Sequence, residues 1–200
     1  MPMASTAQPG GFRPADHPDD IVARISNQSE NTESISSEFL QKKQLRFLDE
    51  TIVSSGKFWF KKENNLRWAY EEPYRYAIII HGGTFRIVDG DQVSDYDIES
   101  NAVFREVNDM IVGMVRGDIL RKDRFGISVF EGPSSYLVKL TPLDPNIGEI
   151  ISEMEIYFSR QNLMVDKIVM KESEEDFTEI TFTDRKINEP IPDTIFLTGR

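Results

Sequence analysis

The sequence predicts a mainly β protein, built from a large antiparallel sheet of about eleven strands with two or three helices. Most segments between residues 35 and 182 alternate apolar and polar side chains with a period of two, as half-buried strands do. Short turn sequences separate these segments, which favours sequential hairpins. One stretch, 101–117, instead places apolar residues at the three- and four-residue spacing of a helix.

The first residues show no periodic pattern. Residues 1–20 contain four prolines and two adjacent glycines, so we expect 1–18 to be a flexible leader or a cloning remnant and 19–200 to be the folded domain. Behind Asp19 and Asp20, which are candidate N-caps, apolar residues fall at helical spacing. This pattern predicts a short helix over 19–29.

The strands of the first half follow one another along the chain. The first is long, and a break in its alternation predicts a bulge near 41–44, between Ile35, Ser37 and Phe39 on one side and Leu45 and Phe47 on the other. Four further runs alternate at Phe58 and Phe60; Leu66, Trp68 and Tyr70; Tyr76, Ile78 and Ile80; and Phe85 and Ile87. The turns between them lie at 63–65, 72–73, 82–83 and 89–91.

The second half begins with the helical stretch and returns to strands. The apolar stripe of 101–117 consists of Val103, Phe104, Val107, Met110, Ile111, Met114 and Val115. Alternation then resumes at Ile127 and Val129; Tyr136, Val138 and Leu140; Met154, Ile156 and Phe158; Leu163 and Val165; and Ile180 and Phe182.

So many one-sided strands leave a broad apolar face that must be covered. A strongly twisted sheet of this size tends to curl, which gives it a concave side. If aromatic strand residues line a hollow there, it suits a long apolar ligand such as an acyl chain, and the helix at 101–117 is a movable cover. The alternative is an ordinary closed core without a ligand, which aromatic residues at strand spacing form more often.

Composition excludes several classes of function. The net charge of −11 opposes binding to nucleic acid or to anionic lipid surfaces. There is no cysteine and there are only two histidines, so we expect no thiolate or histidine metal site. His81-Gly82-Gly83 is similar to an esterase oxyanion loop, but no G-x-S-x-G sequence supplies a nucleophile. We expect neither an enzyme nor a cofactor.

An ordered set of short sequences resembles the LolA family of periplasmic outer-membrane lipoprotein carriers. These sequences are Phe39-Leu40-Gln41, Ser55-Gly56-Lys57-Phe58-Trp59-Phe60-Lys61-Lys62, Leu66-Arg67-Trp68-Ala69-Tyr70, Pro73-Tyr74, Asp89-Gly90, Tyr136-Leu137-Val138-Lys139-Leu140-Thr141-Pro142, Ile156-Tyr157-Phe158, Phe182-Thr183-Asp184, Asn188 and Pro192-Asp193. They stand in family order, and the resemblance covers about residues 20–197. No single sequence is specific, but the glycine, the aromatic strand, the lysine pair and Leu-x-Trp-x-Tyr together are distinctive.

The resemblance implies an unclosed, or half, antiparallel β-barrel with an α-helical lid over a cavity that holds the acyl chains of a lipoprotein. The implied protein is a periplasmic carrier, expected to be a monomer. It receives cargo from an inner-membrane ABC-type lipoprotein-releasing complex and passes it to an outer-membrane lipoprotein receptor, without a cofactor. Family members often carry an arginine that bonds to the lid helices and keeps the empty cavity shut, and Lys62 occupies that position here.

The candidate site follows from these two lines of reasoning. The expected cavity wall consists of Phe47, Phe58, Phe60, Trp68, Tyr70, Ile78 and Ile80. The expected lid consists of Val107, Met110, Ile111 and Met114, with Lys62 as a candidate lid latch. A lysine is a point charge without the planar fork of arginine, so a latch built on it should be looser, and a solvated lysine is the alternative. Two other functions stay open: a lipid-sensing or protein-interaction domain on the same fold, and an outer-membrane receptor.

Overall fold

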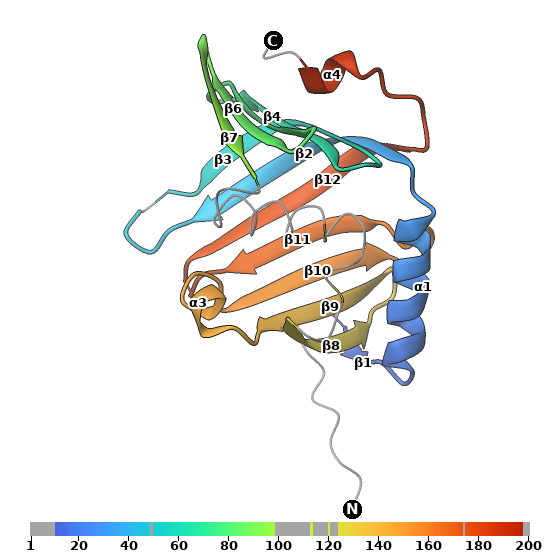
Figure 1. Ribbon diagram of the computed structural model, residues 1–200. Coiled ribbons are helices and arrows are strands. Elements are labelled where there is room, and N and C mark those ends of the chain that lie inside the picture. Colours follow the sequence, from blue (N-terminus) through green and yellow to red (C-terminus); the bar gives the residue numbers. More distant parts are fainter. Residues whose placement is uncertain are drawn as a thin grey trace, which may run out of the picture.

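The computed structural model describes residues 11–48, 50–98, 113, 120, 124–173 and 175–197. Within them lies one antiparallel sheet of twelve strands, in the order β1-β8-β9-β10-β11-β12-β2-β3-β4-β5-β6-β7 (Figure 1). The strands are β1 Arg13–Pro14, β2 Ser34–Gln44, β3 Ile52–Lys61, β4 Asn65–Glu72, β5 Tyr76–His81, β6 Thr84–Asp89, β7 Gln92–Asp97, β8 Phe125–Glu131, β9 Ser135–Pro142, β10 Glu153–Ser159, β11 Val165–Lys171 and β12 Phe177–Ile187.

Two runs of sequential hairpins meet in the middle of this sheet. One runs from β2 to β7 and the other from β8 to β12, and they are joined because β12 pairs with β2. Figure 1 shows the first run folded over toward the second, so that the sheet bends around an interior. In the described residues β1 and β7 end the strand order without pairing to each other. The predicted mainly β, unclosed antiparallel architecture is therefore confirmed.

Three helices that are described over their whole length accompany the sheet. They are α1 Pro18–Glu30, α3 Pro145–Gly148 and α4 Thr194–Leu197. The prediction of a helix over 19–29 is confirmed by α1, whose Ile21 and Ile25 are buried against the β8–β10 side of the sheet. Of the predicted helix 101–117, only Gly113 is described; it is helical.

Two strands of the first hairpin run, β2 and β7, differ from the prediction. The first long strand ends at Gln44, and Leu45–Leu48 form a turn held by a hydrogen bond from Leu48 N to Leu45 O. The predicted bulge near 41–44 is therefore wrong, because a turn stops the strand there. Strand β7 was not predicted, since all six of its residues are exposed and it lacks an apolar face.

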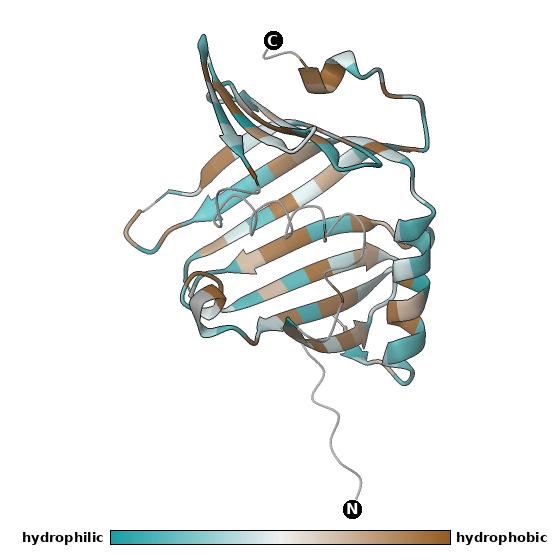
Figure 2. Cartoon of the chain, in the orientation of Figure 1, coloured by the Kyte–Doolittle hydropathy of each residue, from teal (hydrophilic) through white to brown (hydrophobic). Residues whose placement is uncertain are grey.

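The inner face of the bent sheet carries two apolar clusters. One includes Ile25 of α1 and the inward residues of β8–β10, and the other lies mainly on β2–β6. Met170 and Phe182 pack against both clusters and so join them across β11 and β12. Figure 2 shows alternating brown and teal bands along the strands, which is the hydropathy pattern that leads to this one-sided burial.

A smaller cluster covers part of the outer face. Phe196 of α4 is almost completely buried there, against Ala77, Ile79 and Val88 of β5 and β6. The guanidinium of Arg67 donates to the carbonyl oxygen of Ile195 at 3.2 Å, which fixes the C-terminal segment on the outside of β4. This segment therefore lies on the face opposite to the inner clusters.

Candidate functional site

The inner face of β2–β5 is a continuous apolar surface set by strand register. Ser37 of β2 pairs with Phe58 of β3, which pairs with Trp68 of β4, which in turn pairs with Ile78 of β5. Because side chains two residues apart share a face, the flanking rows carry further inward residues such as Phe60. Period-two patterning on four adjacent strands thus produces one wall.

Aromatic rings pack against one another across this wall, in tilted and edge-to-face pairs. The centroid of Trp68 lies 5.2 Å from that of Phe39, 5.3 Å from that of Phe58 and 6.0 Å from that of Phe182. At the end of the wall the ring of Tyr70 stacks on Tyr76 at 4.2 Å. Tilted, edge-to-face and stacked geometries of this kind are favourable for ring pairs, so the aromatic contacts stabilise the wall beyond simple apolar burial.

The hydroxyl of Tyr70 is one polar group of the wall. It donates to Oε1 of Gln41 at 2.9 Å. Burial, together with the neighbouring Tyr76, raises the pKa of Tyr70 above its ordinary value. Tyr70 is therefore a neutral donor at any physiological pH.

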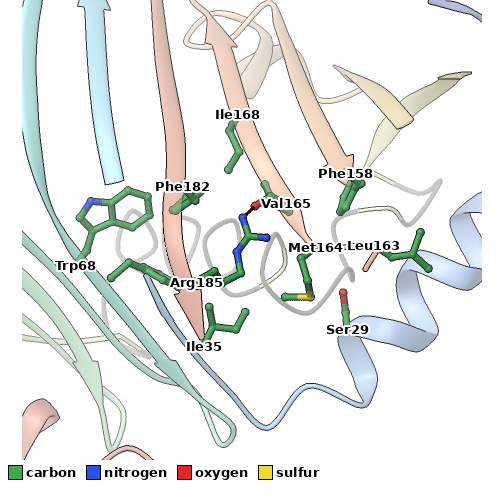
Figure 3. A pocket seen from close by; sticks show the side chains of 11 residues that line it. Ser29, Ile35, Trp68, Phe158, Leu163, Met164, Val165, Ile168, Phe182 and Arg185 are labelled. Atoms are coloured by element: carbon green, nitrogen blue, oxygen red, sulfur yellow. Dashed lines mark hydrogen bonds between the residues drawn. The ribbon is translucent and has the colours of Figure 1, made fainter. Parts of the chain in front are cut away.

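A cavity opens between this wall and strands β10–β12 (Figure 3). Its volume is about 50 Å³. It is lined by Ser29, Ile35, Phe58, Trp68, Phe158, Leu163, Met164, Val165, Ile168, Phe182 and Arg185. The lining is apolar apart from Ser29 and Arg185, and Figure 3 shows the guanidinium of Arg185 among the apolar side chains.

Two buried polar atoms of the inner face lack a hydrogen-bond partner among the residues that the structure describes. They are the hydroxyl oxygen of Ser37 and the indole nitrogen of Trp68. Leaving such groups unpaired costs about 1–3 kcal/mol each. The inner face therefore keeps unused hydrogen-bonding capacity beside a cavity.

Comparison with protein families identifies the chain. The family model described as "Outer membrane lipoprotein carrier protein LolA" matches residues 30–198. The chain belongs to the LolA family. No curated protein matches it.

Solved structures show the same fold as this LolA-family chain at low sequence identity. An uncharacterized conserved protein from Thermus thermophilus has a TM-score of 0.57 at 7% identity, over 92% of this chain and 94% of that one. A chain of the Pseudomonas aeruginosa MucA/MucB complex has a TM-score of 0.55 at 15% identity, over 90% of this chain but only 60% of that one. The lipoprotein LppX of Mycobacterium tuberculosis has a TM-score of 0.50 at 12% identity, over 89% and 99%.

The structure brings together six of the seven residues predicted for the cavity wall. Phe58, Phe60, Trp68, Tyr70, Ile78 and Ile80 all belong to the inner cluster of β2–β6. Phe47 does not: its side chain is 81% exposed in the turn after β2. Its assignment to the wall is wrong because the strand ends three residues earlier. Whether the six bind lipid stays a prediction.

The structure describes the predicted latch of this LolA-family chain but not its predicted lid. Val107, Met110, Ile111 and Met114 lie outside the described residues. Lys62 follows β3, where its ammonium pairs with the carboxylate of Glu33 and its backbone N donates to Glu33 O at 2.8 Å. Its part in holding a lid therefore stays a prediction.

His81, which the sequence compared with an esterase loop, has structural contacts instead. Nδ1 of His81 lies 2.6 Å from Oδ1 of Asn65, and its ring stacks on Phe196 of the outer face. In the described residues there is no group of three metal-ligating side chains, and no helix there is long and apolar enough to span a membrane.

Sequence reasoning missed the far side of the cavity. Met164 precedes β11 and Arg185 lies near the end of β12, and both line the cavity opposite Trp68. Nothing local marks Arg185, because the alternation of Ile180 and Phe182 places residue 184, and not 185, on the inner face. The only available signal was an arginine within an otherwise alternating strand.

Proposed function

We propose that this LolA-family chain is a periplasmic carrier that binds the acyl chains of lipoproteins on its inner face and shuttles them from the inner to the outer membrane. The observation that carries the proposal is the apolar wall of β2–β5 with a cavity beside it, in a chain of this family. The carrier receives its cargo from an inner-membrane ABC-type complex and delivers it to an outer-membrane receptor.

Affinity in this proposal comes from apolar burial. Each methylene removed from water contributes about 0.8 kcal/mol, so an acyl chain supplies ample free energy without any specific contact. The cavity of about 50 Å³ is far smaller than the roughly 300–1,000 Å³ of typical ligand pockets. Cargo must therefore widen the interior, and the cost of that opening offsets part of the gain and keeps transfer reversible.

The small cavity also supports a second candidate function. A sensor or protein-interaction domain needs no lipid space, and a fold relative of this chain is found in the MucA/MucB complex. In that case the inner aromatic residues form a closed core and the binding surface lies elsewhere. An uptake measurement separates the two candidates, because a closed core admits no acyl chain.

The two tryptophans allow a direct test. Trp68 lies on the inner face and lines the cavity, whereas Trp59, which pairs with Arg67, packs on the outer face with the α4 cluster. A Trp59→Phe variant reports only on Trp68, and a Trp68→Phe variant reports only on Trp59. We expect a dibrominated stearoyl chain to quench the fluorescence of the first variant and to leave that of the second nearly unchanged.

Matched substitutions identify the wall as the binding surface. Ile78→Asp places a charge on the inner face, whereas Val93→Asp places one on the exposed edge strand β7. Ile78→Asp should lower the affinity for the acyl chain, measured by quenching, at least about tenfold, because a charge in an apolar site opposes burial of the acyl chain. The second should not change it. Equal quenching of both tryptophans, or no quenching of Trp68, would contradict the carrier proposal and support the closed core.

A further inference from the structure

A β-bulge near the end of β12 turns an arginine into the interior. Thr183 pairs with Glu38 of β2, but the next pair is Lys186 with Ser36, so Asp184 and Arg185 together face the single residue Ser37. Asp184 has a backbone φ of +48°. The extra residue reverses the alternation, so Asp184 is exposed and the side chain of Arg185 is only 12% exposed. Bulges commonly re-aim a side chain beside a functional site.

The guanidinium of Arg185 keeps hydrogen-bonding capacity inside the cavity. Its Nη1 donates to Oδ1 of Asp166 at 3.2 Å. Its Nη2 donates to the carbonyl oxygen of Val165 (Figure 3). Within the described part of the chain it makes no further hydrogen bond. A guanidinium has five N–H donors, so three remain for another acceptor. Its ion-pair partner Asp166 is half exposed and is therefore partly screened by water.

The residues around Arg185 define what it can bind. Trp68, Phe182 and Met164 surround it in the cavity, so an acceptor that reaches it must arrive on an apolar molecule. Opposite the bulge, the buried hydroxyl of Ser37 also lacks a partner among the described residues. The site thus combines an apolar wall with one cation and one unused hydroxyl. This combination suits an acyl chain with a carboxylate or carbonyl group at its head.

We propose that Arg185 is the polar anchor of the ligand site, binding the oxygen atoms at the head of an acyl chain while the chain lies along the wall of β2–β5. This inference rests on the proposed function. The oxygens can be those of a free carboxylate or the carbonyl of an ester or amide, because both accept hydrogen bonds from the fork. A carboxylate also meets the positive charge, whereas an ester or amide carbonyl accepts hydrogen bonds alone.

The test measures quenching of Trp68 in the Trp59→Phe background by dibrominated stearate, its methyl ester and the corresponding alcohol. Arg185→Met removes the donors and keeps an apolar side chain of similar length. We expect it to weaken stearate binding about tenfold to a hundredfold, as the loss of a charge-assisted hydrogen bond does. Equal loss for the ester identifies the carbonyl as the recognised group, and loss for stearate alone identifies the carboxylate.

Arg67→Met is the matched control. Arg67 is also a buried arginine that donates to a backbone carbonyl, but it lies on the outer face. It should leave the affinity for every probe unchanged. The proposal is wrong if Arg185→Met leaves the affinity unaltered, or if both arginine variants lower it equally. In either case the bond from Arg185 to Val165 only stabilises the fold.

The unmodified arginine gives an independent readout if Arg185→Met fails to fold. With Arg185 in place, stearate should bind at least about tenfold more tightly than the alcohol of the same length. Equal affinity for stearate, ester and alcohol overturns the anchor and leaves the carrier proposal standing. Failure of all three probes to bind contradicts the carrier proposal itself.

Discussion

A Cβ atom placed on Gly56 would lie 2.0 Å from the carbonyl oxygen of Ala69 on the neighbouring strand. The close approach occurs where the register between β3 and β4 shifts at Ser55 and Gly56, beside the inner aromatic wall. Backbone atoms cannot move aside as a flexible side chain can. Only glycine therefore fits at this position of the wall.

Gly56→Ala should consequently destabilise the protein by about 3 kcal/mol, because the clash must be relieved by shifting a strand. Gly126→Ala is the control within β8, where the added Cβ would meet nothing closer than 3.8 Å. It should be neutral or stabilising by up to about 1 kcal/mol. Urea unfolding of both variants measures the difference, and equal stabilities would contradict the clash.

Phe60 and Phe47 should differ sharply on truncation. Phe60 is 1% exposed in the inner cluster, whereas Phe47 lies exposed in a turn. Phe60→Ala is expected to lower the free energy of unfolding by about 3–5 kcal/mol through lost burial and a new cavity. Phe47→Ala should change it by no more than about 0.5 kcal/mol. A large loss at Phe47 would show that this side chain is buried after all.

Glu155 should make stability depend on pH below neutrality. Burial on the outer face favours its neutral form, but hydrogen bonds from Lys171, Lys139 and Tyr157 outweigh burial and lower the pKa of Glu155 from 4.5 to about 2. A lowered pKa in the folded state adds stability above about pH 4.5, which is lost as the pH falls toward 2. Thermal melting should show Glu155→Gln less stable than the parent at pH 7, with the difference shrinking toward pH 2.

A matched substitution separates this effect from a general loss of charge. Glu72→Gln removes one carboxylate at an exposed strand end of β4. Its stability difference from the parent should stay within about 0.5 kcal/mol across the same pH range. A gap between Glu155→Gln and the parent that did not narrow in acid would exclude the ionised carboxylate as its source.

The pair of Lys62 and Glu33 tests the predicted latch. Both side chains are substantially exposed, so their attraction is screened by solvent. If Glu33 is the only partner, Lys62→Met and Glu33→Gln should each cost less than about 1 kcal/mol, and the double variant should cost no more than either one. A much larger effect of Lys62→Met in urea unfolding would instead reveal a second contact, as a latch requires.

Local pattern predicted most of the wall for a simple reason. Residues such as Phe58, Trp68 and Ile78 lie in uninterrupted strands, where a period of two fixes the face of every side chain. Phe47 was misplaced because its strand ends at Gln44, and an apolar residue in a turn looks the same in sequence as one in a strand. Period-two alternation therefore predicts the face of a side chain only where the strand stays paired with its neighbours.

The opposite side of the cavity depends on tertiary structure. Arg185 faces inward only because two residues of β12 oppose one of β2, and no turn residue in the sequence marks that bulge. Edge strand β7 could not be predicted from the sequence either, because both of its faces are exposed and it has no apolar alternation. The pairing of β12 with β2 joins segments that are far apart in the chain, and no local sequence pattern predicts it.

That central pairing has a consequence for how the chain reaches its native state. At the junction the hydroxyl of Ser34 donates to the carbonyl oxygen of Glu189, 155 positions further along the polypeptide. Loop closure over such a distance is entropically costly and slow, so the two hairpin arrays can form early while the seam between them is completed last. A chain that is still being synthesised and lacks β12 cannot close that seam, so the first hairpin array has no partner along the free edge of β2 until synthesis is nearly complete.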